Sequence, residues 1–114
     1  MFKRYSISLG RVHDRVRITE GDERLDLKID ADPMRLVAGL SQAQKNLQAL
    51  NQDSTEEDQL KAAEYYAQVI FGKDQAAELL EFYHSDAGCI INVCGKYFEE
   101  RLAKIITRAQ KKQK

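Results

Sequence analysis

The chain has 114 residues, enough for one domain, and its apolar share of 43% is enough for a hydrophobic core, which excludes wholesale disorder. Eighteen Lys and Arg residues balance eighteen Asp and Glu residues, so the formal net charge is zero. A neutral chain has no sequence-wide attraction to nucleic acid or to anionic membranes, which argues against both as general partners.

The first thirty residues alternate between apolar and polar side chains, which is the period of a half-buried strand. Gly10 and the polar cluster at 20–23 are suited to turns. The polar residues between Val12 and Val16 indicate a bulge or a turn at that point. The pattern therefore predicts a small antiparallel sheet of three strands, at residues 3–9, 12–19 and 24–30.

An amphipathic helix is predicted over about 33–50. Asp32 is a good N-cap, and the proline after it suits the first helical turn, where its missing N–H has no helical acceptor. Gly39 interrupts this helix, at a cost of about 1 kcal/mol relative to alanine. The apolar side chains recur every three or four residues and form one stripe, made of Leu36, Leu40, Ala43, Leu47 and Leu50.

Three further helices are predicted after the first. Ser54 and Glu57 fit a capping box that starts the second helix, and Gly72 is placed to end it in a left-handed conformation. Asp74 can cap a short third helix. The last helix is predicted over about 87–110, with one face formed by Ile91, Cys94, Phe98, Leu102, Ile105 and Ala109.

Together these elements predict an α+β fold that is mainly α, with a small N-terminal antiparallel β element followed by about four packed helices. We expect a single domain over 1–114, made of the β element at 1–31, a helical body at 32–110 and a basic tail at 111–114. The start of the chain lacks the apolar run of a signal peptide, and no stretch approaches the roughly 20 apolar residues that span a bilayer. We therefore expect a cytoplasmic protein with no membrane partner.

The residues that could hold a metal or act as a nucleophile are few and scattered. The thiols are Cys89 and Cys94, and the histidines are His13 and His84. No Cys-x-x-Cys or His-x-x-x-His pair brings two ligands together, whereas structural zinc needs four convergent ligands. Both cysteines lie near Ile and Val residues, where a free thiol behaves as a small hydrophobe. We expect no metal, no cofactor and no catalytic group, so the chain is predicted not to be an enzyme.

Charge and aromatic residues indicate surfaces for partners instead. Residues 51–86 carry two Lys against nine acids, and residues 96–114 carry seven Lys or Arg against two Glu. Helix dipoles explain such a separation, but it also permits head-to-tail self-association. The aromatic side chains spread around their helices, so each is either a core residue or part of a surface that accepts a partner helix. The candidate partner-binding residues are Tyr65, Phe71, Phe82, Tyr97, Lys104 and Arg108.

Three motifs lie between residues 60 and 106: Phe71-Gly72, the run from Ala77 to Leu80, and the run from Asn92 to Glu100. Over this span the chain resembles the tail assembly chaperones of long-tailed bacteriophages and prophages. In that family a Phe-Gly pair and a short helix lead into a last helix with spaced Cys, Phe and Glu residues. The linker at 81–86, which replaces a more Gly-rich turn, and the arginines at 11–17 depart from the pattern.

The resemblance implies a non-enzymatic protein that coats the long helical tape-measure protein during tail assembly and leaves before the tail matures. The partners it implies are the tape-measure protein and, as a second candidate, the tail-tube protein, in the cytoplasm of a bacterial host. An alternative is a small nucleic-acid-associated phage or regulatory protein that uses its basic C-terminal helix. A third alternative, an enzyme, lacks a polar cluster in the sequence to support it.

Overall fold

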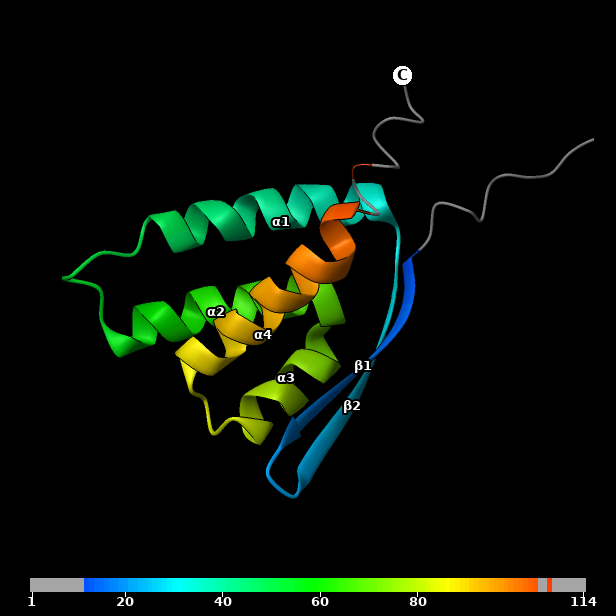
Figure 1. Ribbon diagram of the computed structural model, residues 1–114. Helices are drawn as coiled ribbons and strands as arrows, with labels where there is room; N and C mark the ends of the chain where they lie inside the picture. Colours follow the sequence, from blue (N-terminus) through cyan, green and yellow to red (C-terminus); the bar gives the residue numbers. More distant parts are fainter. Residues whose placement is uncertain (1–11, 105–106, 108–114) are drawn as a thin grey trace, which may run out of the picture.

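The computed structural model of the protein describes residues 12–104 and 107. Within these residues the chain forms a two-stranded antiparallel ribbon followed by four α-helices (Figure 1). The ribbon lies along one side of the helical body and is curved over its length (Figure 1). The fold class is therefore α+β and mainly α, as the sequence predicts.

The ribbon consists of β1 (Val12–Glu20) and β2 (Glu23–Ala31), joined by a two-residue turn. Gly21 takes a φ of 60° in this turn, a conformation that glycine adopts without steric cost. The register runs without interruption along both strands, so the bulge or turn expected near the start of β1 is wrong. The polar residues there are accommodated because His13 and Arg15 face solvent, whereas Asp14 is bound by helical side chains. The strand expected at 3–9 lies outside the described residues.

The first two helices are α1 (Pro33–Gln48) and α2 (Glu56–Phe71). Asp32 caps α1 as predicted, since its carboxylate accepts a hydrogen bond of 2.9 Å from the N–H of Met34. The capping box of α2 lies one residue later than predicted and joins Thr55 to Asp58. Ser54 is not the cap because its hydroxyl accepts from the N–H of Asn51 in the preceding turn.

The next two helices are α3 (Lys73–Phe82) and α4 (Ala87–Tyr97). Gly72 separates α2 from α3 with a positive φ of 86°, as predicted. Asp74 does not cap α3, because the helix already begins at Lys73 and Gly72 holds the N-cap position without a side chain. The carboxylate of Asp86 caps α4 by accepting from the N–H of Cys89 at 3.1 Å.

The helix after Asp86 does not continue as a regular α-helix to residue 110. A π-helical turn, Phe98–Leu102, follows α4, and Ala103, Lys104 and Thr107 are helical beyond it. The buried residues Tyr97 and Leu102 are five residues apart, a spacing that a π turn brings onto one face. Of the predicted apolar face, Cys94 and Leu102 are buried, whereas two further members, Ile105 and Ala109, lie outside the described residues.

One hydrophobic cluster contains residues of the ribbon and of all four helices. Helix α2 lies at its centre, because α1, α3 and α4 all pack against it. Gly39 on α1 allows a close approach to α2: a Cβ there would lie 2.7 Å from Cγ1 of Val69. The glycine that weakens α1 as an isolated helix therefore permits close contact between two helices.

Gln75 on α3 joins the helical body to the ribbon. Its side-chain carbonyl accepts from the N–H of Lys28 at 2.8 Å, and its side-chain amide donates to the carbonyl of the same residue. The amide also donates to the carbonyl of Phe71 at 2.8 Å. This side chain takes the place of a neighbouring strand at the outer edge of β2, so that part of the edge is covered.

Candidate functional site

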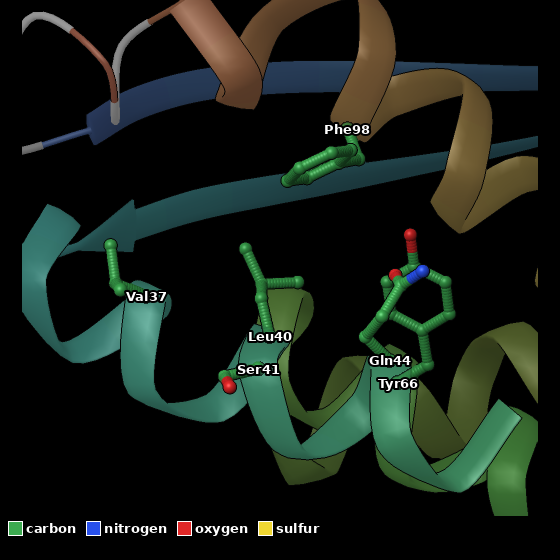
Figure 2. Close-up of a pocket in the computed structure, with 6 residues that line it drawn as sticks. All are labelled: Val37, Leu40, Ser41, Gln44, Tyr66 and Phe98. Atoms are coloured by element: carbon green, nitrogen blue, oxygen red, sulfur yellow. The ribbon is translucent and has the colours of Figure 1, made fainter. Parts of the chain in front are cut away.

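An apolar groove lies between α1 and the π turn that follows α4. Helices α1 and α4 both pack on α2 but make little contact with each other, which leaves the groove open above α2. Its volume is about 250 Å³. Figure 2 shows side chains from α1 facing the ring of Phe98 across this space. The lining residues are Val37, Leu40, Ser41, Gln44, Tyr66 and Phe98.

The α1 side of the groove is a second face of that helix, next to the predicted stripe. Its members are spaced as i, i+3, i+4 and i+7, so they lie along one line over about two turns. Val37 and Leu40 supply apolar surface at one end, and Gln44 supplies a polar group at the other (Figure 2). Of these, Leu40 belonged to the stripe predicted from the sequence, and the rest of the face was missed.

Tyr66 rises from α2 into the same groove (Figure 2). Its side chain is only 7% exposed, and burial, together with the nearby Cys94 and Glu99, raises the pKa of its hydroxyl to about 12. Like any tyrosine hydroxyl at neutral pH, it is protonated and can donate a hydrogen bond. Among the described residues, no hydrogen bond engages it.

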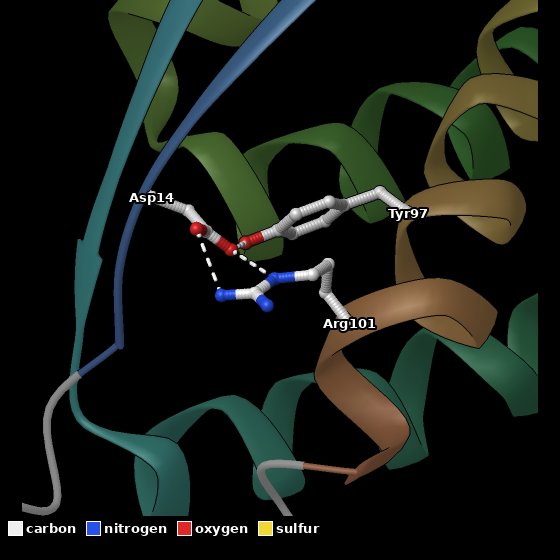
Figure 3. A network of polar contacts seen from close by, with 3 residues as sticks. All are labelled: Asp14, Tyr97 and Arg101. Carbon is white, nitrogen blue, oxygen red and sulfur yellow. Dashed lines mark hydrogen bonds and ion pairs between the residues drawn. The ribbon is translucent and has the colours of Figure 1, made fainter.

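A polar network fixes the other side of the groove. Arg101 donates two hydrogen bonds to the carboxylate of Asp14 on β1, from Nε at 2.9 Å and from a terminal nitrogen at 3.0 Å (Figure 3). The hydroxyl of Tyr97 donates to the same carboxylate at 2.9 Å (Figure 3). Tyr97 and Arg101 flank Phe98, so the network ties the start of the π turn to the ribbon.

The network also alters the ionisation of its members. Partial burial raises the pKa of Asp14, but the hydrogen bonds from Arg101 and Tyr97 and the charge of Arg101 outweigh it and lower that pKa below its ordinary value. Burial and the bonded carboxylate raise the pKa of Tyr97. Asp14 is thus held as a carboxylate, and its role in the fold is to position the π turn.

A larger hollow of about 480 Å³ lies between β1 and α4, but its phenol groups are already engaged. Tyr83 donates to the carboxylate of Glu20 at 3.3 Å, and Tyr97 is bound to Asp14. Cys89 also lines this hollow. Because these tyrosine hydroxyls have internal partners, the groove beside α1 is the better candidate for a binding site.

The six residues predicted to bind a partner do not form one site. Phe71 and Tyr97 are in the core, 5% and 7% exposed, and their rings pack on each other with centroids 6.1 Å apart. Tyr65 is half-buried on α2, and Phe82 packs edge-on against the neighbouring Tyr83 at the end of α3. Neither of these lines the groove.

Two cationic candidates complete that set. Lys104 is exposed beyond the π turn, and Arg108 lies outside the described residues. Arg101, another member of the basic C-terminal segment, is engaged by Asp14. Phe71 and Tyr97 are therefore core residues, which is one of the two roles the sequence allowed for them. A partner-binding role for the other candidates stays a prediction.

The thiols and histidines are not brought together as a reactive site. Cys94 is fully buried, and burial raises the pKa of its thiol to about 12. Cys89 is half-buried, and desolvation with the neighbouring Asp86 raises its pKa also. In the part of the chain that the structure describes, no group of three His, Cys, Asp or Glu residues is arranged to hold a metal ion. Across the same residues, no helix has both the length and the apolar character that crossing a membrane requires.

Comparisons of the chain with protein-family models, with curated proteins and with solved structures found no significant match.

Proposed function

We propose that this protein is a non-enzymatic binding protein that holds an amphipathic helix of a partner in the groove between α1 and the π turn. In line with the resemblance over residues 60–106, the proposed role is that of a phage tail assembly chaperone, and the proposed client is the tape-measure protein in the cytoplasm of the host. The observation that carries the proposal is the open apolar groove above α2, in which Leu40 and Phe98 face each other without closing the space (Figure 2).

The shape of the groove favours a helix as its occupant. Helices that pack on one another lie about 8–10 Å apart, and α2 already carries α1 on one side and α4 on the other. A client helix laid over the groove would insert apolar side chains between the two walls, because a volume of about 250 Å³ holds side chains and not a whole helix. The lining of α1 from Val37 to Gln44 covers about two turns, so a client would bury apolar side chains at positions such as i, i+3 or i+4, and i+7.

The chemistry of the lining favours binding over catalysis. Apart from the phenol of Tyr66, the polar groups in the groove are the hydroxyl of Ser41 and the amide of Gln44. That phenol is protonated at neutral pH as in any tyrosine, and burial raises its pKa further, to about 12. The lining holds no His, Cys, Asp or Glu to act as a nucleophile or as a general base, so contact rather than chemistry is what these residues support.

The test is co-expression with a phage tape-measure protein as the proposed client, followed by affinity purification and a measurement of the dissociation constant. Val37→Glu places a charge in the groove and should weaken the complex at least tenfold, because the carboxylate must be desolvated against an apolar client. The matched control is Met34→Glu, which makes the same kind of change one turn earlier on α1, at a side chain that is 36% exposed and does not line the groove.

Equal binding by the wild type and Val37→Glu, with both folded, would remove the groove as the client site. Absence of any complex with the tape-measure protein would overturn the chaperone proposal. Salt-sensitive retention of DNA, lost on deletion of residues 108–114, would instead support the nucleic-acid alternative.

A further inference from the structure

The outer edge of β1 is an open strand edge. In the part of the chain that the structure describes, the sheet consists of two strands, so each strand has one edge outside the ribbon. Gln75 covers part of the edge of β2 by bonding the N–H and the C=O of Lys28. Among residues 12–104 and 107, no such bond reaches the outer edge of β1. An open edge of this kind accepts a further strand through backbone hydrogen bonds.

Lys28 identifies the backbone groups that the edge of β1 offers. Both of its backbone groups bond Gln75, so they point away from β1. Arg15 lies directly opposite Lys28, and residues opposite each other in an antiparallel pair direct their backbone groups alike, either both toward the partner strand or both away from it. Arg15 therefore directs its N–H and C=O outward, and every second residue of β1 does the same. The outward residues are His13, Arg15, Arg17 and Thr19.

The hollow of about 480 Å³ lies on the β1 side of the ribbon. Val16 and Ile18 line it from β1 and Val93 lines it from α4, whereas no residue of β2 does. Val16 and Leu27 lie opposite each other on the inner face of the ribbon, yet Leu27 is 1% exposed and Val16 is only half-buried. The helices therefore cover the middle of β2 more completely than the middle of β1. A third strand beside β1 would bring side chains into this space.

We propose that residues 3–9 of this chain form that third strand, pairing antiparallel with the outer edge of β1 and filling the hollow against α4. This inference does not depend on the client groove. Gly10 and Arg11 are the only residues between the segment and β1. A short connection that contains glycine suits a hairpin, which returns the chain antiparallel beside the strand that it joins.

The side chains of the segment match the two faces of the ribbon. Its apolar residues alternate with polar ones, so that one face carries Tyr5, Ile7 and Leu9. A shift of one residue would turn this face to solvent, and burial in the hollow therefore selects the register that turns it inward. Ser6 and Ser8 then lie on the exposed side of the sheet.

The charges of β1 argue against a second copy of the chain at this edge. Arg15 and Arg17 are exposed neighbours on the outer face. An antiparallel pair of two β1 edges would set arginines of both copies side by side, and like charges opposite each other destabilise a sheet. Residues 3–9 place serines on that face instead. A strand from another protein would have to displace a segment whose short link gives it a high effective concentration at the edge.

The test is amide hydrogen exchange on the full chain, followed residue by residue by NMR. The amides of Arg15 and Arg17 point outward, so a bonded third strand should slow their exchange about a hundredfold relative to unbonded amides. Ile7→Glu puts a charge on the face that fills the hollow, and it should speed their exchange about tenfold or more. The amide of Lys28, which is bonded to Gln75, should keep its own exchange rate and so reports that the rest of the fold is intact.

Ser6→Glu is the matched control, because it adds the same side chain one residue away on the face that stays in solvent. It should leave the exchange rates unchanged. Labelling of Cys89, which lines the hollow, should become several-fold faster in Ile7→Glu and should stay the same in Ser6→Glu. Rapid exchange at Arg15 and Arg17 in the wild type, or equal exchange in the two variants, would overturn the proposal. Slow exchange that is lost on dilution would overturn it in favour of a second copy, and slow exchange seen only with an added client would overturn it in favour of that client.

Discussion

Helix α1 makes two kinds of contact, one closed and one open. Toward α2, Gly39 brings the helix so close that an added Cβ would lie 2.7 Å from Val69. Toward the π turn, Leu40 and Val37 face Phe98 across a groove of about 250 Å³. These two contacts start from adjacent residues, so the difference lies in side-chain size and in what stands opposite. The helical body is thus tightly packed on one side of α1 and open on the other.

The same division is found along α4. Ile90 and Cys94 are fully buried in the core, whereas Phe98, where the π turn begins, is only half-buried. The π turn marks the boundary between the buried residues and the half-buried Phe98. In its wider turn Leu102 stays buried while Arg101 reaches Asp14. Residues on the closed contacts determine stability, and residues on the open contact are expected to determine binding.

The largest effect on stability is expected where the closed contact is tightest. Gly39→Ala adds one methyl group against the stiff side chain of Val69, and overpacking of this kind costs about 1–3 kcal/mol. The gain in helix propensity offsets about 1 kcal/mol of it. We expect a net loss of about 1 kcal/mol in the free energy of unfolding, measured by urea denaturation.

Gly95 on α4 provides the matched control for that experiment. A Cβ at this position has no atom within 4 Å, so Gly95→Ala should stabilise the protein by about 0.5–1 kcal/mol. The same added methyl should therefore change stability in opposite directions at the two sites. Stabilisation by both substitutions would mean that α1 and α2 are not in close contact at Gly39.

A smaller effect, visible in its pH dependence, is expected from the network that holds the π turn. The pKa of Asp14 is lowered in the folded protein from an ordinary value of 3.8, so the unfolded chain binds its proton first as the pH falls. The stabilisation from Asp14 is therefore complete above the ordinary value and is lost as the pH falls through the lower, folded-state pKa. Asp14→Asn should reduce the free energy of unfolding at pH 7 and should reduce it less and less toward pH 2.

Asp26→Asn is a suitable comparison for Asp14→Asn. Hydrogen bonding to Arg17, opposed by desolvation and aided by the charges of Arg17 and Arg24, lowers the pKa of Asp26 as well, but this carboxylate lies on the exposed face of the ribbon. Exposed ion pairs contribute little because water screens them, so the pH-dependent difference should be smaller than at Asp14. An equal or larger effect of Asp26→Asn would show that the network does not fix the π turn.

The sequence predicted the elements well because their signals are local. The cap at Asp32 and the break at Gly72 depend on a few neighbouring residues, and both were found where expected. The box at Thr55 and Asp58 was misplaced by one residue because Ser54 and Thr55 are both good caps. The π turn was missed because the buried spacing that requires it is set by β1, α2 and α4 packing together.

The groove was harder to predict than the helices. Leu40, Tyr66 and Phe98 follow helical spacing, and that spacing alone does not show whether a facing helix closes over them. The one usable signal was Val37, an apolar residue beside the main stripe of α1 and in line with Ser41 and Gln44. Phe71 and Tyr97 were predicted as surface candidates because the aromatic residues are distributed around their helices in the sequence. They are buried because α2 and α4 contact each other, which the sequence spacing does not show.

The two thiols of α4 allow the closed and open sides to be compared with the least disturbance to the fold. Cys94 is fully buried in the core, whereas Cys89 is half-buried and lines the hollow beside β1. Their pKa values are raised, that of Cys94 to about 12, so both react more slowly than an exposed thiol. With iodoacetamide at pH 8, mass spectrometry should find Cys89 modified first and Cys94 roughly a hundredfold more slowly, because Cys94 must wait for the helices to separate.

This labelling ratio tests the packing of α4 without altering any contact. In Cys89→Ser, the rate at Cys94 should be unchanged. Addition of a groove-bound client should slow Cys94 further, since a ligand that binds only the folded state lowers the population of open forms. Equal rates at the two thiols in the native protein would mean that α4 opens locally, and the division between closed and open contacts would then not extend to this helix.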